Sequence, residues 1–281
     1  MGINLEYITL LSSLEAREQL PKQGKVIEFG AQDISAEPEA AGKHAQRCGM
    51  KHSCSRIDSA RMLYDLYGLH DYTCIDATAE HGALVFDLNN NLRSTYGFSD
   101  TFDLVTDLGT FEHVFDVASA FRNAHEVCKL EGLMIHALPS NCNANHGYYT
   151  MQPRMIADIA AANGYEIVDL VFTVDYKPVL YRFDSENYRD YDDRDLMIYS
   201  VLRKKTDTPF HLPFDSIFTD KNTLTNYQPL LAPLAFSSYI KGTWNNVRPK
   251  AIEEVPTNVL ALTPRCRSWI KRIINRLGVL C

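Results

Sequence analysis

Short apolar segments alternate with helical patterns over the first 204 residues, and this alternation constrains the fold more than any other feature. The central apolar segments are continuous runs, which is typical of parallel strands that are buried on both faces. The sequence therefore predicts an α/β fold with a mostly parallel sheet and helices on both of its faces. The expected strands are 25–29, 72–76, 83–88, 101–108, 133–138, 165–172 and 196–204.

The expected helices are supported by capping signals. Helices are predicted over 4–20 and 56–68, and Asp116 is expected to cap a third helix that ends before Gly132. Pro153 and Gly164 stand where a helix typically begins and ends. Two stretches give no helical signal. Residues 31–55 are polar and irregular, and 77–82 is too short for the helix that usually joins parallel strands.

The composition excludes several classes of function. The formal net charge of -7 argues against nucleic acid as a partner, because phosphate contacts need clustered Lys and Arg. No apolar run approaches the length needed to span a bilayer, and the N-terminus has no signal-peptide pattern. The seven cysteines form no CxxC pair, which indicates reduced thiols in a cytoplasmic protein. The sequence leaves the oligomeric state open.

Three parts are expected in this chain of 281 residues. An N-terminal helix in 1–22 should pack on the core, 23–204 should form the main domain, and 205–281 should form a C-terminal extension. The extension ends in a basic amphipathic helix over 264–281. Such a helix can lie on an anionic membrane surface, which for a cytoplasmic protein is the inner face of the membrane. More often such a helix docks on its own domain or on a partner protein. Both alternatives stay open.

Polar and acidic residues follow the ends of the predicted strands, where ligands bind in sheets of this type. An acidic edge without a GxGxxG motif does not suit a pyrophosphate cofactor. It suits a cofactor with a cationic centre, an ammonium group and a ribose. The residues in these positions are Glu28, Gly30, Gln32, Asp33, Asp76, Asp87, Asp107, Glu112, His113 and His146.

Several motifs together carry a family resemblance. The segments "VIEFGAQD", "CID", "FDLNN" and residues 102–139 resemble the class I S-adenosylmethionine-dependent methyltransferases. Residues 145–167 look like a subset from polysaccharide and glycan gene clusters. The resemblance covers about 23–204. It implies a Rossmann-like sheet of seven strands with an antiparallel last strand. It also implies methyl transfer from S-adenosyl-L-methionine to an oxygen or nitrogen of a small-molecule or glycan-type acceptor.

The same resemblance implies a role for each candidate residue. Glu28 and Gly30 would lie under the methionine part of the cofactor, with Asp107 nearby. Asp76 would accept hydrogen bonds from the ribose hydroxyls, while Asp87 and Leu88 would flank the adenine. The loop departs from the family pattern at Gln32 and Ile34, where side chains would crowd the cofactor; alternatively, Gln32 and Asp33 would hydrogen-bond its ammonium or carboxylate group. Glu112 would orient His113 or contact the cofactor, and His113 or His146 would act as a base or contact the substrate.

Each of these assignments has a plainer alternative. Glu28 can brace its loop, Asp87 can make an ordinary turn, and either candidate histidine can be a loop residue. The family loop has two more glycines than this chain, which has Gln32 and Ile34 in those places. A non-catalytic binding or scaffold protein with a degenerate cofactor loop is therefore the alternative function. His125 and His136, inside a helix and a strand, are expected to be structural.

Two further features leave questions open. Tyrosines and aspartates crowd the segment before the last strand and suit a sugar, or else form a solvated loop. The tyrosines are Tyr176, Tyr181, Tyr188 and Tyr191, and the acids are Asp184, Asp190, Asp192 and Asp193. No metal ligand set is predicted, because Cys48, His52 and Cys54 lack a second ligand pair at standard spacing. The histidine-rich middle region keeps metal assistance open.

Overall fold

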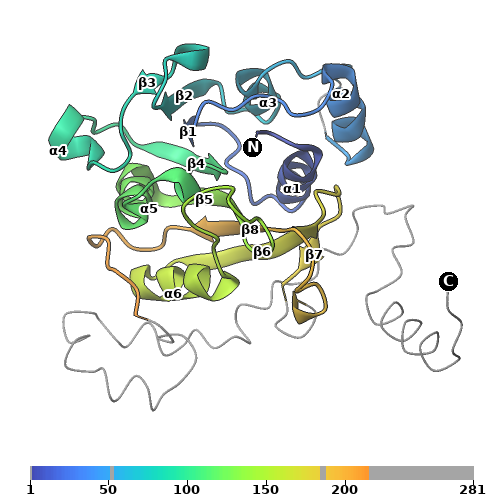
Figure 1. Ribbon diagram of the computed structural model, residues 1–281. Helices are drawn as coiled ribbons and strands as arrows, with labels where there is room; N and C mark the ends of the chain where they lie inside the picture. The colour runs from blue at the N-terminus through green and yellow to red at the C-terminus, as the bar shows by residue number, and fades with distance from the viewer. Residues whose placement is uncertain (1, 51–53, 184–187, 215–281) are drawn as a thin grey trace, which may run out of the picture.

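The computed structural model describes residues 2–50, 54–183 and 188–214 (Figure 1). The basic C-terminal helix predicted over 264–281 lies outside the described residues, as do His52 and Asp184. No helix within the described ranges is both long enough and apolar enough to cross a bilayer.

A single mixed sheet organises the described chain (Figure 1). Its order is β3-β2-β1-β4-β5-β8-β6-β7. The pairs among β1 to β5 are parallel, and β8 lies antiparallel between β5 and β6. The strands are β1 Lys25–Phe29, β2 Asp71–Asp76, β3 Leu84–Val85, β4 Phe102–Leu108, β5 Cys128–Pro139, β6 Glu166–Val174, β7 Tyr181–Arg182 and β8 Leu196–Arg203.

This topology confirms the predicted α/β class, the Rossmann-like, mostly parallel sheet and the antiparallel last long strand. The predicted count of seven strands is wrong for the described residues, which contain eight. The extra strand, β7, is a two-residue segment that pairs with the edge of β6. Its short length gave no apolar pattern to find in the sequence.

Helices cover both faces of the sheet. In Figure 1, α1 to α3 lie to one side of the sheet and α4 to α6 to the other. Two separate clusters of buried apolar side chains fill the two faces, and successive residues such as Val26 and Ile27 of β1 belong to opposite clusters. The helices are α1 Leu5–Ala16, α2 Pro38–Arg47, α3 Ala60–Leu66, α4 Leu92–Tyr96, α5 Val117–Val127 and α6 Pro153–Asn163.

Two local predictions are corrected, and one further helix was not predicted. Residues 31–55 are not wholly irregular, because α2 begins with Pro38 at its first turn and buries Ala41 and Ala45. Residues 83–88 form only the two-residue strand β3. The short helix α4 follows it, between Asn91 as cap and a left-handed Gly97. The five residues of α4 are too few to show a helical period in the sequence, whereas α2 buries a face of small residues, Ala41, Gly42 and Ala45.

The predicted caps are confirmed. The Asp116 side chain accepts a hydrogen bond of 3.0 Å from the backbone N–H of Ser119 at the start of α5. Gly164 ends α6 with a φ of 63°, the left-handed conformation that glycine adopts without strain.

A buried ion pair fastens α1 to the sheet. The Asp169 side chain on β6 is 0% exposed and accepts hydrogen bonds from the guanidinium of Arg17, which directly follows α1. Burial raises the pKa of Asp169, while the neighbouring Arg17 lowers it. The charge on Asp169 is therefore tolerated chiefly because Arg17 is present.

We expect Arg17→Ala to lower the free energy of unfolding by about 3 kcal/mol near neutral pH, because it leaves a carboxylate buried without its main partner. Urea denaturation measures the loss. Lys25→Ala is the matched control, since it breaks the exposed Lys25–Asp71 pair and should cost less than about 1 kcal/mol. Equal losses in the two variants would contradict the anchoring role of Arg17.

Candidate functional site

The loop after β1 is tightly closed around Gly30. Its φ is +89°, and its N–H donates a 2.7 Å hydrogen bond to the carbonyl of Ile75. A Cβ at this position would lie 2.1 Å from Oγ1 of Thr110 and 2.6 Å from Nε2 of Gln32. The loop therefore requires glycine at this point, as the resemblance implies, but side chains already occupy the space beside it.

Gln32 fills the place where the family loop has a glycine. Its side chain is buried, and Nε2 donates a 3.3 Å hydrogen bond to Oγ1 of Thr110, which itself donates to the carbonyl of Phe29. The other amide atom, Oε1, is buried without a hydrogen-bond partner among the described residues. A buried acceptor in this state favours a donor brought by a ligand.

Glu28 points into the core rather than toward open space. Its carboxylate accepts hydrogen bonds from the hydroxyls of Tyr72 at 2.7 Å and Tyr64 at 2.9 Å. Burial raises its pKa to about 7, although both tyrosine hydrogen bonds act to lower it. The structure thus gives Glu28 the bracing environment of the plainer alternative, and its contact with a cofactor stays a prediction.

Asp76 joins the end of β2 to the loop after β1. Oδ2 accepts a 2.9 Å hydrogen bond from the N–H of Ala31, and Oδ1 accepts from both the N–H and the hydroxyl of Thr78 at 2.8 and 3.1 Å. The predicted ribose carboxylate and the glycine loop are therefore neighbours. Asp33 lies further out in the same loop, exposed, with Oδ1 3.0 Å from Nε2 of His81.

Asp87 and Leu88 occupy contrasting positions. Asp87 is exposed and accepts hydrogen bonds from the N–H and the side chain of Asn89, at 2.9 and 2.7 Å, as in an Asx turn. Leu88 is buried in the cluster beneath α4 and α5. Their roles beside an adenine stay predictions.

Asp107 shapes the turn that follows β4. It is fully buried, and Oδ1 accepts hydrogen bonds from the N–H groups of Thr110 and Phe111 at 3.0 and 3.1 Å. Oδ2 lies 3.3 Å from Nδ1 of the buried His136. These contacts fix the 3₁₀ turn η2, Phe111–His113, which presents the next two candidates. His136 thus has the structural setting expected of it.

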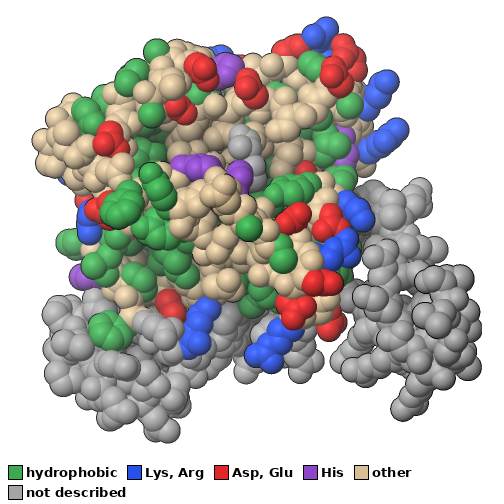
Figure 2. Space-filling model, viewed as in Figure 1, with side chains coloured by type: hydrophobic (Ala, Val, Ile, Leu, Met, Phe, Trp, Pro, Cys, Tyr) green, Lys and Arg blue, Asp and Glu red, His purple; other side chains and the backbone are tan. Residues whose placement is uncertain are grey.

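Three predicted residues come together at this turn. Nε2 of His146 lies 3.5 Å from Oε1 of Glu112, and Nε2 of His113 lies 3.8 Å from the same atom. The Glu112 side chain is 0% exposed, whereas those of His113 and His146 are 46% and 32% exposed. Figure 2 shows histidine side chains close together near the middle of the face it draws.

The charges of this cluster depend on one another. Burial and the nearby charge of Asp107 raise the pKa of Glu112 to about 8. Burial and the neighbouring His146 lower the pKa of His113. These shifts favour the neutral forms of Glu112 and His113 near pH 7, which leaves a nitrogen of the His113 imidazole available as an acceptor or ligand.

The sequence missed several residues that build this edge. Residues near the N-terminus lie across the loop after β1, where Ile3 pairs with Ile34 and its N–H donates a 2.8 Å hydrogen bond to Asp33. Thr110 locks the two loops together, and its place just after a strand end was a readable signal. The pairing of the N-terminal segment with the loop left no pattern in the sequence.

The tyrosine-rich segment mostly packs on the sheet. Tyr181 and Tyr188 lie against the ring of Phe172, with centroid distances of 5.5 and 5.3 Å. Tyr176 reaches the loop that carries His146, where its hydroxyl donates a 2.6 Å hydrogen bond to Asn143. Covering of a substrate by this segment stays a prediction.

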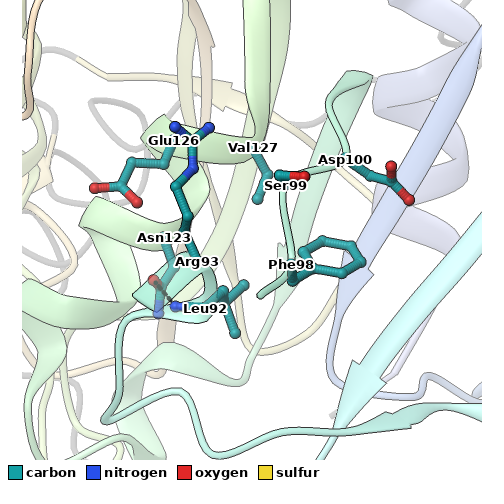
Figure 3. Close-up of a pocket in the computed structure, with 8 residues that line it drawn as sticks. All are labelled: Leu92, Arg93, Phe98, Ser99, Asp100, Asn123, Glu126 and Val127. Atoms are coloured by element: carbon teal, nitrogen blue, oxygen red, sulfur yellow. Dashed lines mark hydrogen bonds between the residues drawn. The ribbon is translucent and has the colours of Figure 1, made fainter. Parts of the chain in front are cut away.

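A separate shallow pocket lies away from these residues (Figure 3). It is formed where residues 98–100 lead into β4 and where α5 ends, so it lies at the amino end of β4. None of the predicted site residues lines it. The lining residues are Leu92, Arg93, Phe98, Ser99, Asp100, Asn123, Glu126 and Val127.

The chain has similarity to known proteins only at the level of structure. No family model matches it, and no curated protein matches it significantly. One similar structure is the N-methyltransferase NodS from Bradyrhizobium japonicum WM9 in complex with S-adenosyl-L-homocysteine. The identity is 11%, the match covers 72% of this chain and 86% of that chain, and the TM-score is 0.41.

A second similar structure is the 1,6-didemethyltoxoflavin-N1-methyltransferase of Burkholderia thailandensis, with 1,6-didemethyltoxoflavin and S-adenosylhomocysteine bound. The identity is 14%, the match covers 72% of this chain and 80% of that chain, and the TM-score is 0.41. Those names describe those proteins, and values this low assign no activity to this chain.

The buried Glu28 makes a pH-dependent contribution to stability. Its folded-state pKa of about 7 lies above the ordinary 4.5, so its contribution is complete below about pH 4.5 and is lost as the pH rises through 7. Relative to Glu28→Gln, the free energy of unfolding of the wild type should fall by on the order of 3 kcal/mol between about pH 4.5 and 8.

Urea denaturation across this pH range measures the difference. Asp71→Asn, which neutralises an exposed carboxylate at the start of β2, is the control and should change the pH profile by less than about 0.5 kcal/mol. Parallel profiles for the wild type and Glu28→Gln would show that Glu28 does not titrate as described.

Proposed function

We propose that this chain is an S-adenosylmethionine-dependent methyltransferase acting on an oxygen or nitrogen of a small-molecule or glycan-type acceptor. The observation that carries the proposal is the convergence of Gly30, Asp76 and the Glu112–His113–His146 cluster at one carboxyl edge of the sheet. The glycan class rests on the resemblance of residues 145–167, and a cytoplasmic location on the cysteine pattern.

The residues present fit the cofactor in two places. Oε1 of Gln32 is a buried acceptor without a partner among the described residues, and it suits the ammonium group of the cofactor. Oδ2 of Asp76 accepts one hydrogen bond from the protein. A carboxylate oxygen offers about two acceptor sites, so Oδ2 retains one for a ribose hydroxyl.

The chemistry divides between the cofactor and the protein. When bound, S-adenosylmethionine supplies an electrophilic methyl group on a positively charged sulfur. In our proposal His113 or His146 accepts the proton of the acceptor group, since both side chains reach the surface. Asp107 fixes the turn that carries His113, and Glu112 lies beside both histidines and would orient them. Positioning of the acceptor supplies much of the rate acceleration.

One observation favours the non-catalytic alternative. Gln32 and Thr110 fill the space beside Gly30 that the family loop leaves open, and they are hydrogen-bonded to each other. A loop closed in this way would not admit the cofactor. In that case the fold would serve as a binding or scaffold protein.

Calorimetric titration with S-adenosylhomocysteine separates the two functions. We expect micromolar binding by the wild type. Asp76→Ala should weaken it about 10- to 100-fold, because a hydrogen bond to a charged group contributes about 1.5–3 kcal/mol. Asp71→Ala is the matched control, since it removes an exposed carboxylate from the opposite end of the same strand and should bind as the wild type does.

The Gln32→Gly variant completes this experiment. A folded wild type that binds nothing, together with a Gln32→Gly variant that binds, would assign the closed loop to Gln32 and support the scaffold alternative. Failure of both proteins to bind would reject the methyltransferase proposal itself.

The base assignment has its own test. With an acceptor found by screening small molecules and glycans, the double variant His113→Ala/His146→Ala should lose about 10²- to 10⁴-fold in turnover number. Its affinity for S-adenosylhomocysteine should change by less than about threefold, because neither side chain is assigned to the cofactor. An unchanged turnover number would reject both histidines as the base.

A further inference from the structure

We propose that Glu112, His113 and His146 form a binding site for one divalent transition-metal ion, with zinc as its natural probe. The sequence predicts no set of metal ligands and leaves metal assistance open. The proposal concerns metal binding alone and does not depend on methyl transfer.

The distances suit coordination with little movement. The three ligand atoms all lie within 4.8 Å of one another, and Oε1 of Glu112 is 3.5 and 3.8 Å from the two histidine Nε2 atoms. Two ligand atoms bound tetrahedrally to zinc at about 2.1 Å are about 3.4 Å apart. Small rotations of the exposed histidine side chains bring all three atoms within bonding distance of one ion.

The carboxylate of Glu112 provides an independent indication of a ligand. Neither oxygen accepts a hydrogen bond from any described residue, although the side chain is fully buried. The other buried carboxylates of this edge are satisfied, since Glu28 accepts from two tyrosines and Asp107 from two backbone amides. A buried carboxyl group without a protein partner is costly, and a cation held by the neighbouring imidazoles would satisfy it.

The backbone holds the three ligands in place before any ion binds. Glu112 and His113 belong to the turn fixed by Asp107. His146 lies on the loop after β5, which is fastened to the same turn because the N–H groups of Tyr148 and Tyr149 donate to the Glu112 carbonyl at 2.8 and 3.2 Å.

Gly147 makes that close approach possible. A Cβ on Gly147 would lie 2.8 Å from the Glu112 carbonyl oxygen and 3.0 Å from its Cγ. The loop carrying His146 therefore presses directly on the carboxylate ligand. A site built in this way loses little conformational freedom when the ion binds.

The ligand set selects the class of metal and leaves room for a substrate. Two imidazoles and one carboxylate suit zinc and other divalent transition metals better than magnesium or calcium, which prefer oxygen. Three protein ligands leave a tetrahedral zinc ion one open position, as catalytic zinc sites do. The exposed histidines face solvent, so this position is accessible.

The open position would activate an acceptor group. Metal coordination lowers the pKa of a bound hydroxyl, so in the metal-loaded protein the acceptor proton would pass to water, and this route would replace the histidine base proposed above. This consequence rests on the proposed methyl transfer, whereas the binding of the ion does not.

Calorimetric titration of the metal-free full-length protein with Zn²⁺, followed by Co²⁺ to record the visible spectrum, tests the site. We expect one equivalent of each ion and a cobalt spectrum without sulfur-to-metal charge transfer. Glu112→Gln, His113→Ala and His146→Ala should each weaken Zn²⁺ binding at least about 100-fold. Removing a residue that only orients a metal ligand typically weakens binding by about 10- to 100-fold, so a loss of this size indicates a direct ligand.

His70→Ala is the matched control. His70 is an exposed histidine whose Nδ1 lies 3.2 Å from the Asp65 carboxylate. Among the described residues it belongs to no group of three possible metal ligands. Its removal should leave Zn²⁺ affinity unchanged. Circular dichroism confirms that each variant is folded, and Glu112→Gln keeps the size of the buried side chain.

Two results overturn the proposal. One is the absence of saturable Zn²⁺ binding by the folded wild type. The other is binding that persists in all three ligand variants, which would assign the ion to a different site, including one with cysteine ligands if sulfur-to-metal charge transfer appears. Because these titrations contain no cofactor, their failure is distinct from failure to bind S-adenosylhomocysteine.

Discussion

The parallel pairing of β1 with both β2 and β4 determines where the candidate residues lie. In this register Phe29 pairs with Ile75 on one side and with Asp107 on the other. The three strands therefore end at nearly the same level, and the loops that follow them meet. Gly30 bonds to the end of β2, while Thr110 from the loop after β4 bonds to the end of β1. A slip by one residue would move every side chain to the opposite face of the sheet.

Three buried carboxyl groups near this edge differ in what satisfies them. Glu28 is held by tyrosine hydroxyls and Asp107 by backbone amides and His136. Both stabilise loops and have few free lone pairs for a ligand. Glu112 differs, because its oxygens accept no hydrogen bond from the described residues, and Oε1 lies 3.5 and 3.8 Å from the imidazoles of His146 and His113. Burial therefore does not by itself distinguish a structural carboxylate from a functional one, and the hydrogen-bond partners do.

The sequence predicted the fold well and the side-chain environments less well. Continuous apolar runs and strong caps at Asp116 and Gly164 identified the long strands and helices, because burial on both faces leaves a clear pattern. The two-residue β7 and the five-residue α4 are too short to leave such a pattern. Strand ends correctly brought Glu112, His113 and His146 to one region. The tyrosines that surround Glu28 could not be predicted, because Tyr64 comes from α3 and Tyr72 from the neighbouring strand β2, and only the folded chain brings them to Glu28.

The carboxyl edge of the sheet is filled by hydrogen-bonded side chains around Gly30 but not around Glu112, and this difference bears on the proposed function. Around Gly30 the side chains of Gln32 and Thr110 fill the space and bond to each other, so a cofactor must displace or recruit Gln32. In the other half, the imidazoles of His113 and His146 reach the surface, while the buried Glu112 carboxylate accepts no hydrogen bond from the described residues. An unsatisfied buried polar group costs stability unless a ligand pairs with it. Oε1 of Gln32 and both carboxylate oxygens of Glu112 are in this state among the described residues, as the proposed binding of ligands at this edge requires.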